Sequence, residues 1–181
     1  MKLPPKLNLL LLPLLLAACK KDELNLLPDA TQTGANTMGA IVNNRAWVAN
    51  GGTGFNSPDP VEGGYLASRS YDETRNNVLK SAYRKDKTSF QIYIRNVSQP
   101  GEFLLNTTTN LFGGELRQPH NYGAYYIPGK VFMTTSRYTG KVIITKADTI
   151  NKIVSGIFAF KAVHGKDTVT VTHGRFDAGK R

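Results

Sequence analysis

Cysteine is almost missing from this sequence of 181 residues, which contains one, Cys19. An intramolecular disulfide needs two cysteines, so none can stabilise this chain even in an oxidising compartment. Its stability must therefore come from a hydrophobic core. The residues after position 18 suit one domain, and a body of about 145 residues can bury roughly 70% of its unfolded surface.

An apolar run long enough to cross a membrane as a helix is also lacking, because such a helix takes about 20 residues. The run Leu7–Leu16 is shorter and is interrupted twice by other residues. It follows Lys2 and Lys6 and precedes small residues, which is the order of a secretory signal peptide. We therefore predict that residues 1–18 are a signal peptide.

The single cysteine stands in the sequence Leu16-Ala17-Ala18-Cys19, which resembles a bacterial lipobox. The resemblance implies that the Cys19 sulfur carries a diacylglyceryl group and that Cys19 begins the mature chain. Two or more acyl chains, such as palmitate, make membrane anchoring effectively permanent. The alternative is an ordinary signal peptide followed by an unmodified cysteine.

The residues after the cysteine predict an exposed, lipidated N-terminus and tether over residues 19–36. Lys20-Lys21-Asp22-Glu23 looks like the lysine-plus-acidic export tag of Bacteroidota lipoproteins, which implies an outer-membrane protein facing the cell surface. The alternative is a solvated tether on the periplasmic face. Residues 24–36 follow no strand or helix period, and we expect them to wrap the domain edge through Leu26 and Leu27.

Alternation of apolar and polar residues predicts strands rather than helices. In residues 89–97, Phe90, Ile92 and Ile94 fall on one face. Glycine-containing turns are expected at Thr139-Gly140 and at His164-Gly165-Lys166. A further turn is expected at Arg84-Lys85-Asp86-Lys87. The other candidate strands are 39–49, 64–70, 77–84, 131–135, 142–146, 153–163 and 168–172, rich in β-branched and aromatic residues.

These segments predict that residues 37–181 form a single all-β domain. Short strands joined by tight turns must hide an apolar face and their edges. We expect an antiparallel meander that closes into a β-sandwich, with a small up-and-down or lipocalin-like β-barrel as the alternative. In the last strand Val169 and Val171 share a phase that Phe176 breaks, so we also predict a β-bulge near Gly174.

Four blocks of this sequence together resemble a family of small Bacteroidota lipoproteins of unknown function. The resemblance covers most of the mature chain and implies a lipid-anchored β domain; it implies no activity. The blocks are Leu27-Pro28-Asp29-Ala30-Thr31-Gln32-Thr33-Gly34-Ala35-Asn36-Thr37-Met38-Gly39, the block from Tyr138 to Asp148, the block from Asn151 to Phe160, and Gly174-Arg175-Phe176-Asp177.

Catalytic and metal-binding patterns are missing from the sequence. Zinc sites need three or four converging ligands, but His120, His164 and His173 show no such spacing. No Gly-x-Ser-x-Gly elbow of a serine hydrolase occurs, and the spacing of the carboxylates singles out no glycosidase pair. We therefore predict no enzyme activity, no catalytic residue, no metal and no cofactor.

The aromatic residues suggest a binding surface instead. Tyr122, Tyr125 and Tyr126 stand among small residues, and tyrosine offers a rigid amphipathic contact that suits sugars and protein partners. Trp47, in a separate glycine-rich region, could join them. The alternative is an ordinary strand whose tyrosines alternate between core and solvent.

Basic residues outnumber acidic ones, which gives a net charge of +10. From position 130 onward, ten Lys or Arg residues stand against three Asp residues. This excess favours an anionic glycan, lipopolysaccharide or another envelope protein as partner, or it is the solvent side of several strands. Nucleic acid is not expected, because no basic stripe alternates with aromatic residues.

Two short segments resemble an O-glycosylation acceptor of Bacteroidota, and they point to Thr149 in Asp148-Thr149-Ile150 and Thr168 in Asp167-Thr168-Val169. Three functions remain open from the sequence. The first is a lipid-anchored, non-catalytic binding or display module. The second is a lipocalin-like carrier of a small apolar ligand, and the third is a surface hydrolase.

Overall fold

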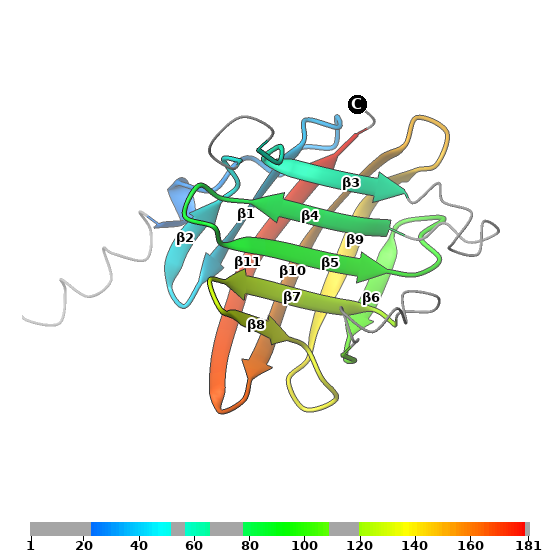
Figure 1. The fold of residues 1–181 in the computed structure, drawn as a ribbon. Coiled ribbons are helices and arrows are strands. Elements are labelled where there is room, and N and C mark those ends of the chain that lie inside the picture. Colours follow the sequence, from blue (N-terminus) through cyan, green and yellow to red (C-terminus); the bar gives the residue numbers. More distant parts are fainter. Residues whose placement is uncertain (1–22, 52–56, 66–77, 109–119, 180–181) are drawn as a thin grey trace, which may run out of the picture.

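The structure, a computed structural model, describes residues 23–51, 57–65, 78–108 and 120–179. These residues form antiparallel strands and one helical turn at 23–25 (Figure 1). The strands are β1 (Thr37–Val42), β2 (Arg45–Val48), β3 (Val61–Tyr65), β4 (Val78–Tyr83), β5 (Ser89–Ile94), β6 (Gly101–Leu105), β7 (Tyr122–Ile127), β8 (Lys130–Met133), β9 (Gly140–Asp148), β10 (Ile153–His164) and β11 (Asp167–Ala178).

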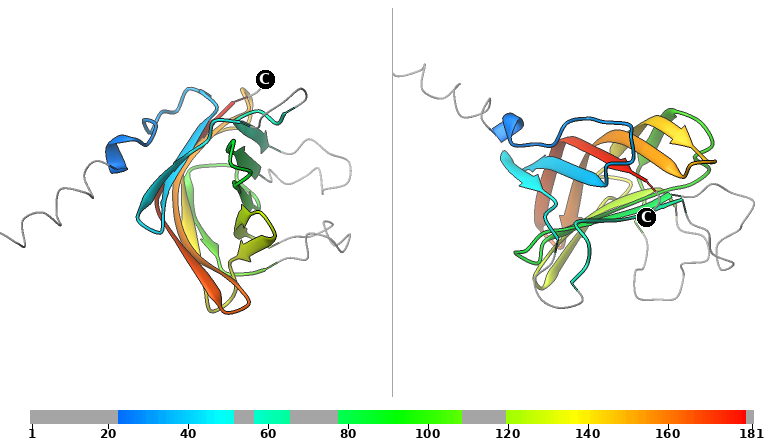
Figure 2. Two further views of the ribbon diagram at one scale, coloured as in Figure 1. Left: turned by 60° about the vertical axis from the view of Figure 1, so that its left-hand side comes forward. Right: turned by 90° about the horizontal axis from the view of Figure 1, so that it is seen from above.

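The strands form one continuous sheet that folds into two layers. Its order is β2-β1-β11-β10-β8-β7-β5-β4-β3, with β9 beside β10 and β6 beside β9. β10 connects the layers, because its residues 153–160 pair with β9 whereas Val163 pairs with Met133 of β8. We name the two parts the β11 layer (β2, β1, β11, β10, β9, β6) and the β5 layer (β8, β7, β5, β4, β3). Their strands cross in Figure 1 and face each other in Figure 2.

The predicted all-β, antiparallel fold is confirmed, as a sheet folded in the manner of a sandwich or an open barrel. Most neighbours in sequence are neighbours in the sheet, as in a meander. Four pairings depart from the sequence order: β5 with β7, β8 with β10, β6 with the outer edge of β9, and β1 with β11. The last two cover a strand edge that a simple meander would leave bare. No helix in the described ranges is long and apolar enough to span a membrane.

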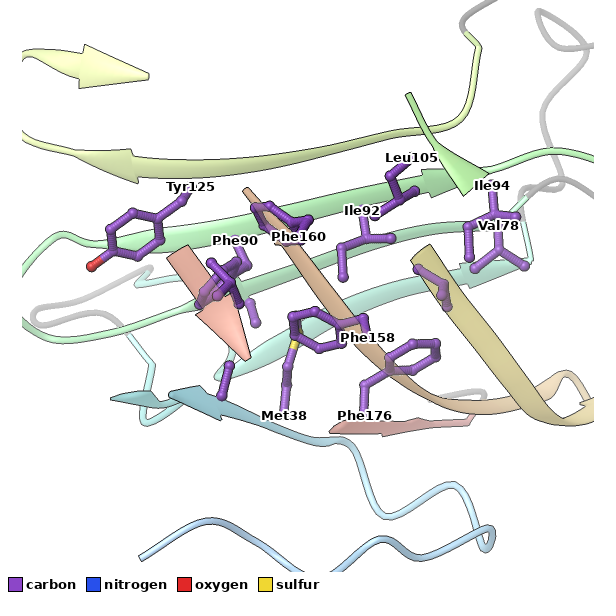
Figure 3. Close-up of a cluster of buried hydrophobic side chains, with 14 of the residues drawn as sticks. Met38, Val78, Phe90, Ile92, Ile94, Leu105, Tyr125, Phe158, Phe160 and Phe176 are labelled. Atoms are coloured by element: carbon purple, nitrogen blue, oxygen red, sulfur yellow. The ribbon is translucent and has the colours of Figure 1, made fainter. Parts of the chain in front are cut away.

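Aromatic and aliphatic side chains fill the space between the two layers (Figure 3). Phe90 of β5 lies at the centre of this core, with its ring centroid 4.7 Å from that of Trp47 and 4.9 Å from that of Tyr125. Phe158 of β10 contacts Phe90 from the opposite layer at 5.9 Å. Burial of each such side chain contributes about 1.5–3 kcal/mol, so these contacts hold the layers together without any crosslink.

Two predicted details of the strands are confirmed. Phe90, Ile92 and Ile94 of β5 all face the core and are no more than 1% exposed. The turn after β4 closes with backbone hydrogen bonds from Arg84 N to the Thr88 oxygen and from Lys87 N to the Arg84 oxygen, and Lys87 adopts a φ of 65°. The alternation of apolar and polar residues in this segment therefore results from the burial of one strand face, as expected from the pleat of a strand.

The β-bulge predicted near Gly174 is also confirmed. The β10–β11 register shifts between Phe158 and Phe160, and His173 is the bulged residue, with a φ of 51°. Phe176 consequently returns to the core and is 3% exposed. Gly174 is required here, because a Cβ at this position would lie 2.5 Å from the Phe158 ring.

Three predictions on turns and strand bounds need correction. The turn at Thr139-Gly140 is wrong: Gly140 begins β9, and a Cβ there would lie 2.2 Å from the Phe160 Cβ, so this glycine permits close strand packing. Residues 39–49 are a hairpin, β1 and β2, around Asn43 and Asn44 with φ of 47° and 67°. The strand expected at 64–70 is β3, Val61–Tyr65, and residues 66–70 lie outside the described ranges.

Residues 27–36, which we name the strap, lie on the outside of the β11 layer (Figure 2). Pro28 crosses β1 at Gly39, where a Cβ would be 2.6 Å from the proline Cδ. Arg175 of β11 donates from Nη1 to the Pro28 carbonyl oxygen at 3.2 Å. The predicted wrapping is confirmed for Leu27, which is 7% exposed, and is wrong for Leu26, which is 64% exposed.

Candidate functional site

The strap is fastened by one buried carboxylate near the end of β11. Asp177 is 1% exposed and accepts six hydrogen bonds, which makes it the anchor point of the segment. We name this arrangement the Asp177 clasp. The donors are Thr31 Oγ1 at 2.7 Å, Thr33 N at 2.9 Å, Thr33 Oγ1 at 3.3 Å, Gly34 N at 2.9 Å, Ala35 N at 3.1 Å and Ser155 Oγ at 2.7 Å.

The local conformation of the strap creates this anion site. Gly34 adopts a φ of 79°, which lets successive backbone N–H groups converge on one carboxylate. Gly34 and Gly179 also pack closely, since a Cβ on Gly34 would lie 3.0 Å from the Gly179 Cα. Asn36 completes the contact by accepting a hydrogen bond from the Gly179 N–H at 3.2 Å.

The hydrogen bonds keep Asp177 ionised although it is buried. Burial by itself would raise the pKa of this carboxyl group, but the donors on Thr31, Ala35, Ser155 and Gly34 outweigh burial and hold its pKa well below its usual range. A buried carboxylate is tolerated only when it is fully hydrogen-bonded. The clasp is therefore a structural anchor rather than a proton donor or acceptor.

An open groove of about 300 Å³ lies beside the strap, on the outer face of the β11 layer. We name it the outer groove. Its floor is formed by side chains of β9 and β10, among them Ile157, which is paired with Ile143 and is 43% exposed. The strap contributes Ala30. The lining residues are Ala30, Ile143, Ile157, Phe158, Ala159, Gly174, Lys141, His173 and Arg175.

Three of these lining residues are basic and none is acidic. Arg175 is held over the groove by its hydrogen bond to the strap, and His173 is presented at the surface by the bulge. Lys141 stands at the other end, where its Nζ lies 2.8 Å from Glu102 Oε2. The groove thus combines an apolar floor with a cationic rim, which suits binding better than acid–base chemistry.

The four aromatic residues predicted as a binding surface do not share one exposed face. Trp47 is 2% exposed and donates its indole N–H to Thr88 Oγ1 at 2.7 Å. Tyr125 also belongs to the core between the layers. Tyr122 and Tyr126 lie on the other side of β7, and ligand binding by these four residues stays a prediction.

Tyr122 and Tyr126 are tied to the same acceptor. Both hydroxyls donate to Gln91 Oε1, at 2.9 and 3.0 Å, and the Tyr122 ring stacks on Tyr93 at 5.9 Å. Burial, with a smaller effect of Tyr83, raises the pKa of Tyr126 to about 12. These tyrosines form a second apolar cluster on the outer face of the β5 layer.

The remaining predicted sites fall in different places. Cys19, Lys20, Lys21 and Asp22 lie outside the described residues, whereas the Glu23 carboxylate accepts the backbone N–H of Ala46.

Of the two threonines predicted as glycosylation sites, Thr149 lies in the β9–β10 turn and is half-buried, and Thr168 is the second residue of β11 and is exposed. His120 and His164 are exposed, and His164 Nδ1 lies 3.1 Å from the Val131 oxygen. Within the described ranges, no three His, Cys, Asp or Glu side chains are grouped so that they could hold a metal ion.

Sequence reasoning did not find the outer groove or the Asp177 clasp. A signal for the groove was present, because Ile157 and Ala159 are apolar and fall on the phase of β10 that faces away from Phe158. The clasp joins three of the four sequence blocks: the first supplies the strap, the third Ser155 and the fourth Asp177. The contacts of Asp177 thus give a physical reason why these three blocks occur together.

Comparison with known proteins gives one match. The model of a protein family described as a domain of unknown function, DUF6252, matches residues 67–179. No curated protein and no solved structure matches the chain. The matched range includes β4 to β11, and with them Ser155, Asp177 and all of the outer groove except Ala30. The chain therefore belongs to the DUF6252 family.

Proposed function

We propose that this protein is a lipid-anchored binding module of the cell envelope, without catalytic activity of its own. The observation that carries the proposal is the outer groove: an open, apolar, basic-rimmed concavity built on regular strands. Binding sites are typically concave and mostly apolar, with a few placed polar groups. The sequence Leu16-Ala17-Ala18-Cys19 supports the anchor.

The packing of the core supports binding at the surface rather than carriage inside the fold. Phe90, Phe158 and Phe160 place their rings within 5.9–6.2 Å of one another between the two layers. A carrier would need an apolar cavity of several hundred Å³ at that place. The surface groove offers about 300 Å³ without displacing any of these rings.

The position of the strap supports a close attachment of the domain to the membrane. Four residue steps separate Cys19 from Glu23, whose carboxylate contacts β2. An extended chain covers at most about 3.6 Å per residue, so the Glu23 backbone would lie within roughly 14 Å of an acylated Cys19, and β2 would lie one side chain further away. Force on the anchor would pass through the strap to Asp177.

The anchor is tested by mass spectrometry of the protein taken from native membranes. We expect a mature chain that begins at Cys19 and carries acyl groups. Cys19→Ala removes the only thiol, and we expect the variant to lose acylation and to keep its leader. An unmodified Cys19 in the wild-type protein would contradict the anchor.

The binding module is tested by capture from native envelope extract with the full chain carrying Cys19→Ala. Ile157→Asp places a charge in the floor of the groove, and we expect it to abolish capture. Ile150→Asp is the matched control, because Ile150 is 89% exposed and does not line the groove. Capture that both variants retain would reject the groove as the binding site.

A further inference from the structure

We infer that the outer groove binds a single amphipathic anion, a molecule with an apolar body and one acidic group. The apolar body would lie on Ile143 and Ile157, and the acidic group would face Arg175. This inference rests on the proposed function and adds to it the chemical class of the ligand.

The floor of the groove favours an apolar body. Ile157 lies in the middle of the β11 layer, between Arg175 on β11 and Ile143 on β9. Ile157 is nevertheless 43% exposed, on the outer face of the sheet. Ile157 and the half-buried Ala159 two residues further along β10 gain free energy when an apolar surface covers them.

The rim of the groove favours a negative charge on the ligand. Lys141, His173 and Arg175 approach the floor from β9 and β11, and no acidic side chain lines the groove. A guanidinium has five N–H donors, and Arg175 uses one of its Nη1 donors on the Pro28 carbonyl oxygen. That bond fixes the side chain in place, so less conformational entropy is lost when Arg175 binds a carboxylate or sulfonate.

The partner of Lys141 does not cancel this charge. Glu102 pairs with Lys141 at 2.8 Å, but Glu102 itself does not line the groove, and both side chains are about half exposed. An exposed ion pair of this kind is weak. A ligand carboxylate can therefore compete for Lys141 or leave the pair intact and bind at Arg175.

The size and shape of the groove favour one small molecule over a membrane surface. Its volume is about 300 Å³, roughly twice that of the engineered protein cavity of about 150 Å³ that holds benzene. The strap forms one wall of the groove through Ala30, so the site is concave. A bilayer surface, in contrast, is flat on this scale. We therefore expect binding of a monomeric molecule.

The test uses two fluorescent probes of nearly the same shape. Anilinonaphthalene sulfonate carries an apolar body and one sulfonate, and phenylnaphthylamine has the same body without the charge. The protein is the full chain with Cys19→Ala, so that no acyl chain competes for the groove. Any binding to the retained leader is common to all variants, and circular dichroism verifies that each variant is folded.

We expect the sulfonate probe to bind at least about tenfold more tightly than the uncharged probe, the effect of one charge-assisted hydrogen bond. Ile157→Asp should weaken binding of the sulfonate at least about tenfold, whereas Ile150→Asp should leave it unchanged. Lys141→Met and Arg175→Met should each reduce the preference for the charged probe. Lys141→Met is the more secure variant, because Lys141 makes no contact with the strap that an Arg175 change would disturb.

Four results would overturn the inference. The first is equal affinity for both probes, and the second is equal behaviour of Ile157→Asp and Ile150→Asp. The third is binding to anionic lipid vesicles without binding of either probe, which would assign the groove to a membrane surface. The fourth is absence of probe binding together with Ile157-dependent capture from envelope extract, which would reject the ligand class and leave the proposed binding module standing.

Discussion

β11 carries a carboxylate at each end, Asp167 where it begins and Asp177 where it finishes, and the surroundings of the two differ. Asp177 is 1% exposed and is surrounded by donors from the strap and from β10. The Asp167 side chain is 58% exposed and forms an ion pair with Lys130, with a smaller electrostatic effect of His164. The pKa of both groups is lowered, in Asp177 by hydrogen bonds that outweigh burial and in Asp167 by Lys130.

The difference teaches where this fold depends on polar contacts. At the Asp167 end water can replace Lys130, so the ion pair adds little. At the Asp177 end the residue is 1% exposed, and six protein donors bind its carboxylate in place of water. An aspartate in this strand thus adds little to stability at position 167, whereas at position 177 it holds the strap on the sheet.

The largest effect is expected when the same substitution is made at the two ends. Asp177→Ala removes the acceptor of all six hydrogen bonds of the clasp, and it should lower the free energy of unfolding by at least about 3 kcal/mol. Asp167→Ala should leave it unchanged within error. Urea denaturation measures the free energy of unfolding of both variants. Equal losses at the two positions would contradict the larger structural role of Asp177.

The second effect is a pH dependence that belongs to one end only. Because folding lowers the pKa of Asp177, its contribution is complete above the unfolded pKa of 3.8 and is lost as the pH falls below it towards the folded pKa. We expect wild-type stability to decline steeply with falling pH in this range and Asp177→Asn to decline less. Urea denaturation at several pH values tests this, and identical slopes would contradict it.

The third effect concerns two glycines with positive φ. Gly34→Ala forces a strained backbone and a contact with Gly179, and we expect a loss of about 2 kcal/mol. Gly165 in the β10–β11 turn also has a positive φ, 60°, but nothing lies within 4 Å of its would-be Cβ. Gly165→Ala should therefore cost about 1 kcal/mol or less. Thermal unfolding of the pair separates conformational strain from packing.

The smallest effect is expected at Ser155, which donates one of the six hydrogen bonds. Ser155→Ala removes this bond without creating a large cavity, and we expect a loss of about 1–2 kcal/mol. In a double-mutant cycle the loss should shrink when Asp177 is already replaced by Asn. Losses that simply add would show that Ser155 acts independently of the clasp.

The parts of the fold that the sequence predicts are those with one buried face. β5 and β11 each carry core residues at alternate positions, and the break in phase at Phe176 indicates the bulge. β7 does not alternate, since Tyr122–Ile127 begins with four buried residues in succession. Its tyrosines therefore resemble surface residues in the sequence although the structure buries Tyr122 and Tyr125.

The rest depends on partners that are far apart in the chain. β6 is five residues long and is placed by its pairing with β9. Asp177 receives five of its six donors from residues 31–35, with a sequence separation of 142–146. No local sequence pattern predicts this long-range contact between the strap and β11. The outer groove depends on the same contact, because Ala30 of the strap forms part of its lining.

The pairing of β1 with β11 has a consequence for how the protein is made. During synthesis β1 leaves the ribosome long before β11, its partner strand. Until β11 has been made, the growing chain has neither the acceptor for the strap nor the strand on which β1 pairs, so a product that lacks β11 cannot reach the native state. Proteins dominated by such distant pairings fold slowly, and we expect this layer to form only after β11 has left the ribosome.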